Sequence, residues 1–382
     1  MCGFFCIISK NANRLDKKKI FNSAKLIAHR GPDDNHSISS NHYVFSFYRL
    51  SLRDLSINGR QPMYSTCNRF VICFNGEIYN SEYLRSKYLP NFIFKGTSDT
   101  EILLELYKTK GEKIIGELEG MFSLLIYDNL SNKTLLARDR IGIKPLYFKK
   151  TSEGLIVSSE IKPILKYSNE VSMNYSAFAE FFLRGSMDHN KTFFKDVEVV
   201  MPGTYLSYKN NNLKSQKYWD IKKIIKLEKK KKSIKDLLDD SIKKHLISDV
   251  RIGSFLSGGT DSSLITSLAN KKLNYKISTF TYDFLNSKNF SESERARRIA
   301  IKIGALNQNV KINHRFVLEN FDKLIKGVES PITSIRLFGT FKNYIAAKEK
   351  KIKIILEGQG GDEVFAGYDY NYIFYFKDLV KN

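Results

Sequence analysis

Short apolar or alternating runs, separated by turn residues, dominate the first half of the chain. Runs of this kind predict β-strands, here at 4–9, 43–52, 70–79, 121–128, 134–139, 145–150 and 155–160. Two stretches with apolar residues at helical spacing, 17–28 and 99–110, predict helices. Because the predicted strands outnumber the helices and follow one another through turns, we expect an α+β sandwich of antiparallel sheets in this half.

The pattern changes in the second half, where predicted strands alternate with predicted helices. The strands are expected at 250–256, 276–282 and 352–358, and the helices at 262–272, 291–303, 317–328 and 346–350. Such alternation is typical of βαβ units, in which the strands form a parallel sheet. The second half is therefore predicted to be an α/β domain.

A lysine-rich stretch separates the two patterns. Residues 214–235 contain ten lysines against Asp220 and Glu228, which is typical of a solvated linker. A chain of 382 residues is long for a single core. We therefore predict a first domain at 1–213, a linker at 214–232 and a second domain at 233–382.

The composition excludes several classes of protein. The net charge of +22 allows nucleic-acid binding, but the lysines are spread along the chain without clustered arginines, so we expect no nucleic-acid partner. The longest apolar stretches are too short to cross a bilayer and no leader pattern is present at the start, which indicates a cytoplasmic protein with no membrane partner. The four cysteines form no CxxC pair, so neither a zinc site nor a disulfide framework is expected.

Cys2 directly follows the initiator Met1. Removal of Met1 would leave a residue with both a thiol, of ordinary pKa about 8.5, and an α-amino group, of ordinary pKa about 7.7 to 8.0. The amine can then accept the thiol proton near neutral pH, so nucleophile and base share one residue. A Met-Cys start also arises by chance, so this pattern alone leaves both interpretations open.

A glycine- and serine-rich loop follows the strand predicted at 250–256 and precedes a helix. The loop SGGTDSS, 257–263, places two glycines, three serines and an aspartate at the amino end of that helix, where unpaired N–H groups can bind a phosphate. Asp261 can hold a magnesium ion. No lysine follows the glycines as in a Walker loop, so transfer of a terminal phosphate is not indicated.

A second loop, EGQGGDEVFAGY at 357–368, follows the strand predicted at 352–358. Loops at the carboxyl ends of parallel strands open on the same edge of the sheet. We therefore expect Asp362 and Glu363 to face Asp261 across a bound nucleotide. A plain acidic turn is the alternative interpretation of this loop.

Together these motifs resemble the glutamine-hydrolysing asparagine synthetases, which join an N-terminal-nucleophile glutaminase to an ATP pyrophosphatase. The resemblance is carried by MCGF at the start, FLSGGTDSS, the helix SESERARRIA and EGQGGDEVFAGY, and by HRGPDD (29–34), YRLSLRD (48–54), NGEIYN (75–80), GTSDTE (96–101), ARDRIGIKPLY (137–147) and SSEIK (158–162). It implies an N-terminal-nucleophile hydrolase sandwich followed by an α/β parallel-sheet ATP-pyrophosphatase domain.

The resemblance also implies roles for individual residues of the glutaminase. Cys2 would attack the side-chain amide of glutamine, and Asn75 with the N–H of Gly76 would form the oxyanion hole. Glutamine-binding residues implied in the same way are Arg49 for the α-carboxylate, Asp99 for the α-ammonium, and the backbone groups of Leu50, Leu52 and Glu77.

For the synthetase half, the resemblance implies ATP as co-substrate with Mg²⁺, and the formation of asparagine, AMP and pyrophosphate from aspartate. Asp261 and Asp362 are the implied metal ligands, and Gln359 occupies the position linked to the adenylated intermediate. The implied ATP-binding residues are Leu256, Ser257, Gly258, Gly259, Asp261, Ser262, Tyr282, Glu357 and Gly358. The small-molecule partners would be glutamine, aspartate and ATP, and a homodimer is compatible with the sequence.

The chain departs from the family pattern in two respects. Gln359 stands where an acidic residue is usual, and Glu357 where a serine is usual. The chain also ends at Asn382, before the long helical section of the family, so we expect a truncated second domain. Three alternatives stay open: amidation of a different carboxylate, for example in surface-polysaccharide synthesis; a truncated form that retains only glutaminase or binding activity; and an RNA-associated ATP pyrophosphatase.

Overall fold

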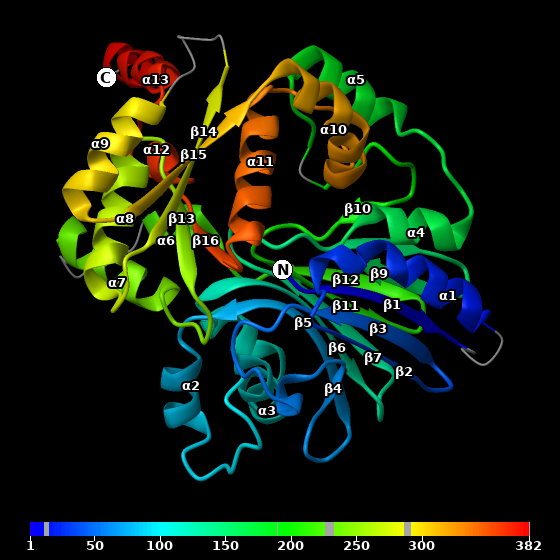
Figure 1. Cartoon of the computed structure of the whole chain (residues 1–382). Coiled ribbons are helices and arrows are strands. Elements are labelled where there is room, and N and C mark those ends of the chain that lie inside the picture. The colour runs from blue at the N-terminus through cyan, green and yellow to red at the C-terminus, as the bar shows by residue number, and fades with distance from the viewer. Residues whose placement is uncertain (11–14, 189, 226–232, 286–291, 382) are drawn as a thin grey trace. The chain divides into compact units, whose positions relative to one another are not determined.

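A computed structural model describes residues 1–10, 15–188, 190–225, 233–285 and 292–381 of the chain (Figure 1). The chain divides into two compact units, Met1–Lys230 and Lys231–Asn382. Among the described residues, no helix combines the length and the apolar character that crossing a membrane requires.

The first unit contains two six-stranded antiparallel sheets, as predicted for an α+β sandwich. One sheet has the order β10 (Glu198–Val199), β8 (Tyr147–Lys150), β9 (Gly154–Ser158), β1 (Gly3–Ser9), β3 (Tyr43–Arg49) and β2 (Asp34–Ser39). The other has the order β12 (Asn212–Lys217), β11 (Thr204–Lys209), β7 (Lys133–Arg138), β6 (Gly120–Asp128), β5 (Phe70–Ile78) and β4 (Met63–Tyr64).

Strand β1 shows how the sequence builds this sandwich. Successive side chains of a strand point to opposite faces of its sheet. Phe4, Cys6 and Ile8 accordingly join one buried cluster with residues of the second sheet, whereas Phe5 and Ile7 join another with helical residues. Because both faces of β1 are covered, the strand is apolar almost throughout rather than alternating.

Helices cover the outer faces of the two sheets. The cluster on the first sheet includes side chains from α1 (Lys17–Ala24), η2 (Lys25–Arg30) and α4 (Ile161–Ser168). The cluster on the second sheet includes side chains from α2 (Ser81–Tyr88), α3 (Asp99–Lys110) and η4 (Gly111–Glu117). Helix α3 has the predicted bounds and begins at Ser98, whose side chain accepts the N–H of Glu101. A further helix, α5 (Tyr175–Arg184), was not predicted.

The second unit is built on a parallel sheet, as predicted from the alternation of strands and helices. Its order is β15 (Leu306–Ile312), β14 (Ser278–Phe284), β13 (Ile252–Phe255) and β16 (Ile354–Leu356). Strand β15 was missed, because its sequence LNQNVKI is largely polar and it lies at the edge of the sheet.

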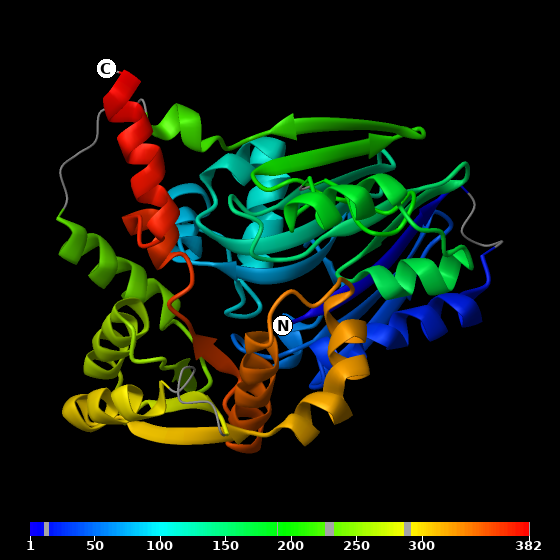
Figure 2. The ribbon, with the colours of Figure 1, turned by 90° about the horizontal axis from the view of Figure 1, so that it is seen from above.

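Helices lie on both faces of this sheet. One buried cluster joins strand residues to α11 (Arg336–Glu349), and two others join them to α7 (Ile234–His245), α8 (Thr260–Lys272) and α9 (Ser293–Ile303). Helix α10 (His314–Val328) contacts α11. Helices α12 (Gly361–Phe365) and α13 (Asp369–Lys381) follow, and Figure 2 shows α13, in red, clear of the sheet of its own unit.

The predicted linker at 214–232 needs a correction at its start. Residues 212–217 form β12, which pairs with β11 through the backbone, and α6 (Ile221–Ile225) follows. Lysines are tolerated in this strand because it lies at the edge of its sheet, where side chains reach solvent. Residues 226–232 lie outside the described residues, so the linker stays a prediction there.

Candidate active sites

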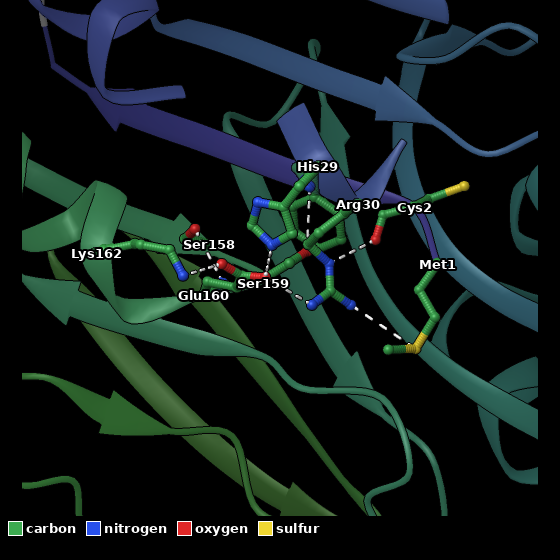
Figure 3. Close-up of polar contacts among 9 residues, drawn as sticks. Met1, Cys2, His29, Arg30, Ser158, Ser159, Glu160 and Lys162 are labelled. Carbon is green, nitrogen blue, oxygen red and sulfur yellow. Dashed lines mark hydrogen bonds and ion pairs between the residues drawn. The ribbon is translucent and has the colours of Figure 1, made fainter. Parts of the chain in front are cut away.

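The Cys2 thiol lies in a small cavity of about 60 Å³ in the first unit. Cys2 immediately precedes β1, and its sulfur lies 3.4 Å from the N of Leu50 and 3.5 Å from the O of Leu50. Arg30 Nε donates a hydrogen bond of 2.9 Å to the Cys2 carbonyl (Figure 3). Burial raises the pKa of the Cys2 thiol, so ionisation of this group requires a nearby base or positive charge.

Asn75 and Gly76 lie in β5 and line the same cavity. The Asn75 side chain is 1% exposed, and its Nδ2 has no hydrogen-bond partner among the described residues. A buried donor without a partner is costly, so it indicates a group that a ligand will satisfy. At Gly76 a Cβ atom would lie 2.2 Å from the Met121 carbonyl oxygen, so only glycine fits beside β6.

Arg49, Leu50, Leu52 and Glu77 also line this cavity. Arg49 ends β3 and is buried, and its guanidinium donates to the carbonyls of Asp54 and Ser56, the latter at 2.8 Å. The loop after β3 therefore holds this side chain in place before any substrate binds.

Asp99 is the exception among the predicted glutamine-binding residues, because it does not line the cavity. Its neighbours Ser98 and Thr100 do. The Asp99 carboxylate accepts the N–H of Ile78 at 2.8 Å and lies 4.0 Å from Arg53. Burial raises the pKa of Asp99, against the opposing charge of Arg53. The structure thus places Asp99 beside Ile78 of β5 and Arg53, next to the cavity but not in its lining.

Two charged side chains of the cavity, Arg53 and Lys144, had no assigned role in the sequence analysis. Lys144, in the motif ARDRIGIKPLY, is buried and lines the cavity, and burial lowers the pKa of its ammonium. Arg53, in the motif YRLSLRD, lines the cavity as well. Both residues belong to motifs that had been singled out, but nothing in their spacing indicated that their side chains meet Cys2.

The α-amino group at the start of the chain is carried by Met1, which also lines the cavity. Burial lowers the pKa of this amine to about 5, with further lowering by Arg30 and Lys144. An amine in this environment is therefore neutral at pH 7 and can accept a proton.

A second, larger cavity of about 450 Å³ lies in the second unit, where β13 leads into α8. The Ser257 hydroxyl lies 2.9 Å from that of Ser262 and accepts the N–H of Gly259. The amino end of α8 adjoins this loop, and such an end attracts anions. Predicted ATP-binding residues that line the cavity are Leu256, Ser257, Gly259, Asp261, Ser262, Tyr282, Glu357 and Gly358.

Gly258 alone among the predicted ATP-binding residues does not line the cavity. Its φ is +80°, and a Cβ atom there would lie 2.9 Å from the Ala296 nitrogen of α9. Glycine is required at this position by the turn and by the neighbouring helix. Gly258 therefore allows the turn of the loop and does not contribute to the cavity wall.

The second loop meets the first as expected for adjacent parallel strands. Gln359 and Asp362 line the same cavity as Asp261. A Cβ atom at Gly361 would lie 2.1 Å from Asp261 Oδ2, so this carboxylate contacts the backbone of the second loop. Glu363, which we expected to face Asp261, is exposed and accepts a hydrogen bond from the Tyr368 hydroxyl instead.

The carboxylates of this cavity fit a magnesium ion only in combination with a phosphate ligand. Within the described ranges, no group of three or more His, Cys, Asp and Glu side chains is placed to hold a metal. Mg²⁺ commonly takes one or two protein carboxylates and completes its shell with phosphate oxygens and water. Asp261 and Asp362, lining one cavity, match this requirement.

Several residues of the second cavity were missed by the sequence analysis. Arg336, Thr340 and Asn343 line it from α11. Asn343 is buried, and its Oδ1 lacks a hydrogen-bond partner among the described residues. Tyr344, next along α11, donates a 2.7 Å hydrogen bond to Glu357. The predicted helix in this region began only at residue 346, which hid these side chains.

Comparison with known proteins identifies the family of each half of the chain. Residues 1–219 match the family model of a glutamine amidotransferase domain, and residues 233–378 match that of asparagine synthase. The chain is 32% identical over 97% of its length to asparagine synthetase [glutamine-hydrolyzing] 1 of Bacillus subtilis, and covers 59% of that protein. It is also 32% identical over 91% of its length to amidase chyE of Penicillium rubens, covering 54%, and 29% identical over 97% to asparagine synthetase B of Escherichia coli, covering 65%.

The chain thus spans roughly three fifths of the length of these relatives. The matched models cover the two structural units in the order in which the two cavities occur. The chain belongs to the asparagine synthase family and consists of a class II glutamine amidotransferase domain followed by an asparagine synthase domain.

Proposed function

We propose that this chain hydrolyses glutamine at Cys2 and uses the ammonia to amidate a carboxylate that ATP has activated, with aspartate as the acceptor and asparagine as the product. The observation that carries the proposal is the unpaired Nδ2 of Asn75, a buried donor in the cavity that also contains the Cys2 thiol. A donor of this kind is suited to an oxyanion that exists only during the reaction.

Glutamine hydrolysis would begin once Met1 has been removed and Cys2 carries the α-amine. The amine takes the thiol proton, and the sulfur attacks the side-chain amide carbon. Asn75 and the N–H of Gly76 stabilise the oxyanion, ammonia leaves with the transferred proton, and water then hydrolyses the thioester to glutamate. Burial and neighbouring positive charge favour the neutral amine, as they do for the Met1 amine in the structure.

Glutamine would be oriented by groups on the cavity wall. Arg49, already fixed by two carbonyls, binds the α-carboxylate with its remaining donors. Leu50, Leu52 and Glu77 contribute backbone groups. The Asp99 carboxylate, which does not line the cavity, would attract the α-ammonium through its charge.

The second reaction would join AMP to the acceptor carboxylate, with release of pyrophosphate. The loop 257–263 and the amino end of α8 bind the phosphates. Asp261 and Asp362 would hold Mg²⁺, which neutralises charge on the departing pyrophosphate. Ammonia then attacks the activated carbonyl and displaces AMP.

One observation favours a second candidate, an acceptor other than aspartate. Glu357 stands in the cavity where the family pattern has a serine, and it accepts a hydrogen bond from Tyr344. Because like charges repel, a carboxylate at this position disfavours an acceptor that carries a second negative charge close to Glu357. It favours an acceptor with an amine or a neutral group there. Gln359 adds a neutral amide in place of an acidic side chain.

Two assays on the purified full chain test the proposal. Glutamate release is measured with glutamine alone, and pyrophosphate release is measured with ATP, Mg²⁺ and ammonia, with and without aspartate. We expect glutamate release and aspartate-dependent pyrophosphate. Pyrophosphate release that responds to other carboxylates but not to aspartate would support the second candidate, and the absence of both products would refute the proposal.

A further inference from the structure

The backbone of Cys2 is fixed by a side chain rather than by a β-ladder. Pairing of β1 with β3 begins only at Gly3, which faces Tyr48, so Cys2 lies outside the ladder. Residues at a chain end are poorly ordered unless something holds them. Here the Cys2 carbonyl accepts a hydrogen bond from Arg30 Nε at 2.9 Å.

The sequence makes room for this contact. A Cβ atom at residue 3 would lie 2.8 Å from Arg30 Cδ, so the glycine after Cys2 lets the arginine pass beside the chain. Of the remaining guanidinium nitrogens, Nη1 lies 3.0 Å from Glu160 Oε1 and Nη2 lies 3.9 Å from Met1 Sδ (Figure 3). The Arg30 and Glu160 side chains are each 8% exposed.

Glu160 is itself held by several partners. His29 Nε2 lies 2.9 Å from Oε1, and Lys162 Nζ lies 2.5 Å from Oε2. The backbone N–H of Glu160 donates to Ser158 Oγ, and Ser159 Oγ accepts the N–H of Phe4 (Figure 3). Residues 158–160, at the end of β9, therefore hold the beginning of the chain through two contacts. Ser159 binds the Phe4 N–H, and Glu160 binds Arg30, which in turn binds the Cys2 carbonyl.

The charge state of Glu160 agrees with this arrangement. Burial by itself would raise the pKa of this carboxyl, but the hydrogen bonds and charges of its cationic partners lower it to about 2. The carboxylate stays ionised at neutral pH, and a buried ionised group of this kind fixes the geometry of the donors around it.

We infer that Glu160 is a positioning residue for the nucleophile: it orients the Arg30 guanidinium, which fixes the Cys2 carbonyl and thereby the direction of the Cys2 sulfur. Glu160 does not line the cavity and so does not touch the substrate. The inference rests on the glutamine hydrolysis proposed above and deepens it. A displacement of about 1 Å of a reacting group can cost on the order of 100-fold in rate, so indirect positioning has a measurable effect.

The test is Glu160→Gln in the full chain, which removes the charge and keeps the size. We expect kcat for glutamine hydrolysis to fall about 10- to 100-fold, with KM for glutamine changed less than about 3-fold, because the substrate contacts remain. The rate constant for inactivation by 6-diazo-5-oxo-norleucine, an electrophilic glutamine analogue, should fall by a similar factor. Glu160→Asp should recover part of the rate.

Glu170→Gln is the matched control, because it removes a carboxylate that pairs with Lys149 in the same unit, away from the cavity. It should leave both constants unchanged. If folded Glu160→Gln keeps the wild-type kcat, or changes only the melting temperature, the inference is overturned. If Glu160→Gln does not fold, Arg30→Gln must show the same split between kcat and KM, and an unchanged kcat there overturns the inference.

Failure of the proposed function has a different signature. A wild-type chain that releases no glutamate and does not react with the analogue at Cys2 contradicts the proposed hydrolysis itself. A wild-type chain that is active, with folded Glu160→Gln equally active, contradicts only the positioning role.

Discussion

The cavity around Cys2 and the cavity after β13 differ in how their residues are held. In the first unit, Arg49 and Asn75 lie in β3 and β5 and Cys2 directly precedes β1, and the cavity measures about 60 Å³. In the second unit, loops that follow β13 and β16 line a cavity of about 450 Å³. The first site is therefore held by the strands of its core, whereas the second combines strand ends, loop backbone and side chains of α8 and α11.

The cores around the two sites explain this difference. Among the described residues, the smallest buried cluster of the first unit has ten members, and the largest of the second unit has five. Well-packed surroundings hold side chains in defined rotamers, and a small core does so less. Under the proposed function, glutamine hydrolysis would depend on individual buried side chains, while nucleotide binding would depend on the geometry of the loop 257–263 and on charge.

The largest effect is expected for Cys2→Ala, which removes the nucleophile of the first site. Glutamate release should fall by about 10⁴-fold or more, because no other group can form the thioester. Pyrophosphate release with ammonia should be unchanged, since it uses only the second cavity. Both rates are measured on the same preparation, with circular dichroism as the check on folding. A parallel loss of both activities in a folded protein would break the separation of the two sites.

Asp261→Asn should impair the second site and leave the first site active. Loss of one carboxylate charge at the phosphate loop should lower ATP-dependent pyrophosphate release by about 100-fold, an effect typical of removing one electrostatic group. Glutamine hydrolysis should stay within about 2-fold of wild type. The corresponding change at an acidic residue of the second loop, Glu363→Gln, is the control, because Glu363 does not line the cavity. If Glu363→Gln were the more damaging change, the assignment of Asp261 would be wrong.

A third prediction uses pH to test the buried charges of the first unit. The pKa of Glu160 falls from its ordinary value of 4.5 to about 2 on folding, so its contribution to stability is complete above about pH 4.5 and is lost as the pH falls towards 2. Wild type should therefore exceed Glu160→Gln in free energy of unfolding by about 1 to 2 kcal/mol at pH 7. Urea unfolding at pH 7, 4 and 3 should show this difference shrinking. A difference independent of pH would indicate lost packing instead of lost charge.

The smallest effect on activity is expected from labelling of the exposed thiol. Cys67 is exposed, and its pKa is lowered by hydrogen bonding to Ser65, whereas Cys6 and Cys73 are fully buried. Iodoacetamide should therefore modify Cys67 before Cys6 and Cys73, which should react only after unfolding, and modification of Cys67 by itself should cost little glutamine hydrolysis. Peptide mass spectrometry follows each site. Early modification of Cys6 or Cys73 would show that the first core opens more readily than its packing indicates.

Much of the secondary structure was predictable because its periodicity is local. The strands at β1, β5 and β6 and the helix α3 appear where their apolar patterns placed them. Strand β2 was missed, because it lies at an edge and its sequence DNHSIS is polar on the outside. Helix α11 was predicted too short, since its first turns contain residues that line the nucleotide cavity instead of a core.

The sequence by itself determined the two classes of fold and singled out Cys2 and the loop 257–263 as candidate site residues, because each depends on neighbours along the chain. Only the tertiary structure decided that Asn75 Nδ2 has no partner among the described residues, that Lys144 lines the cavity and that Asp99 does not. The tertiary structure also showed that Arg30 binds both the Cys2 carbonyl and the Glu160 carboxylate. The reason is physical: pairings between strands far apart in the chain bring these side chains together, and no local pattern specifies which atoms then meet.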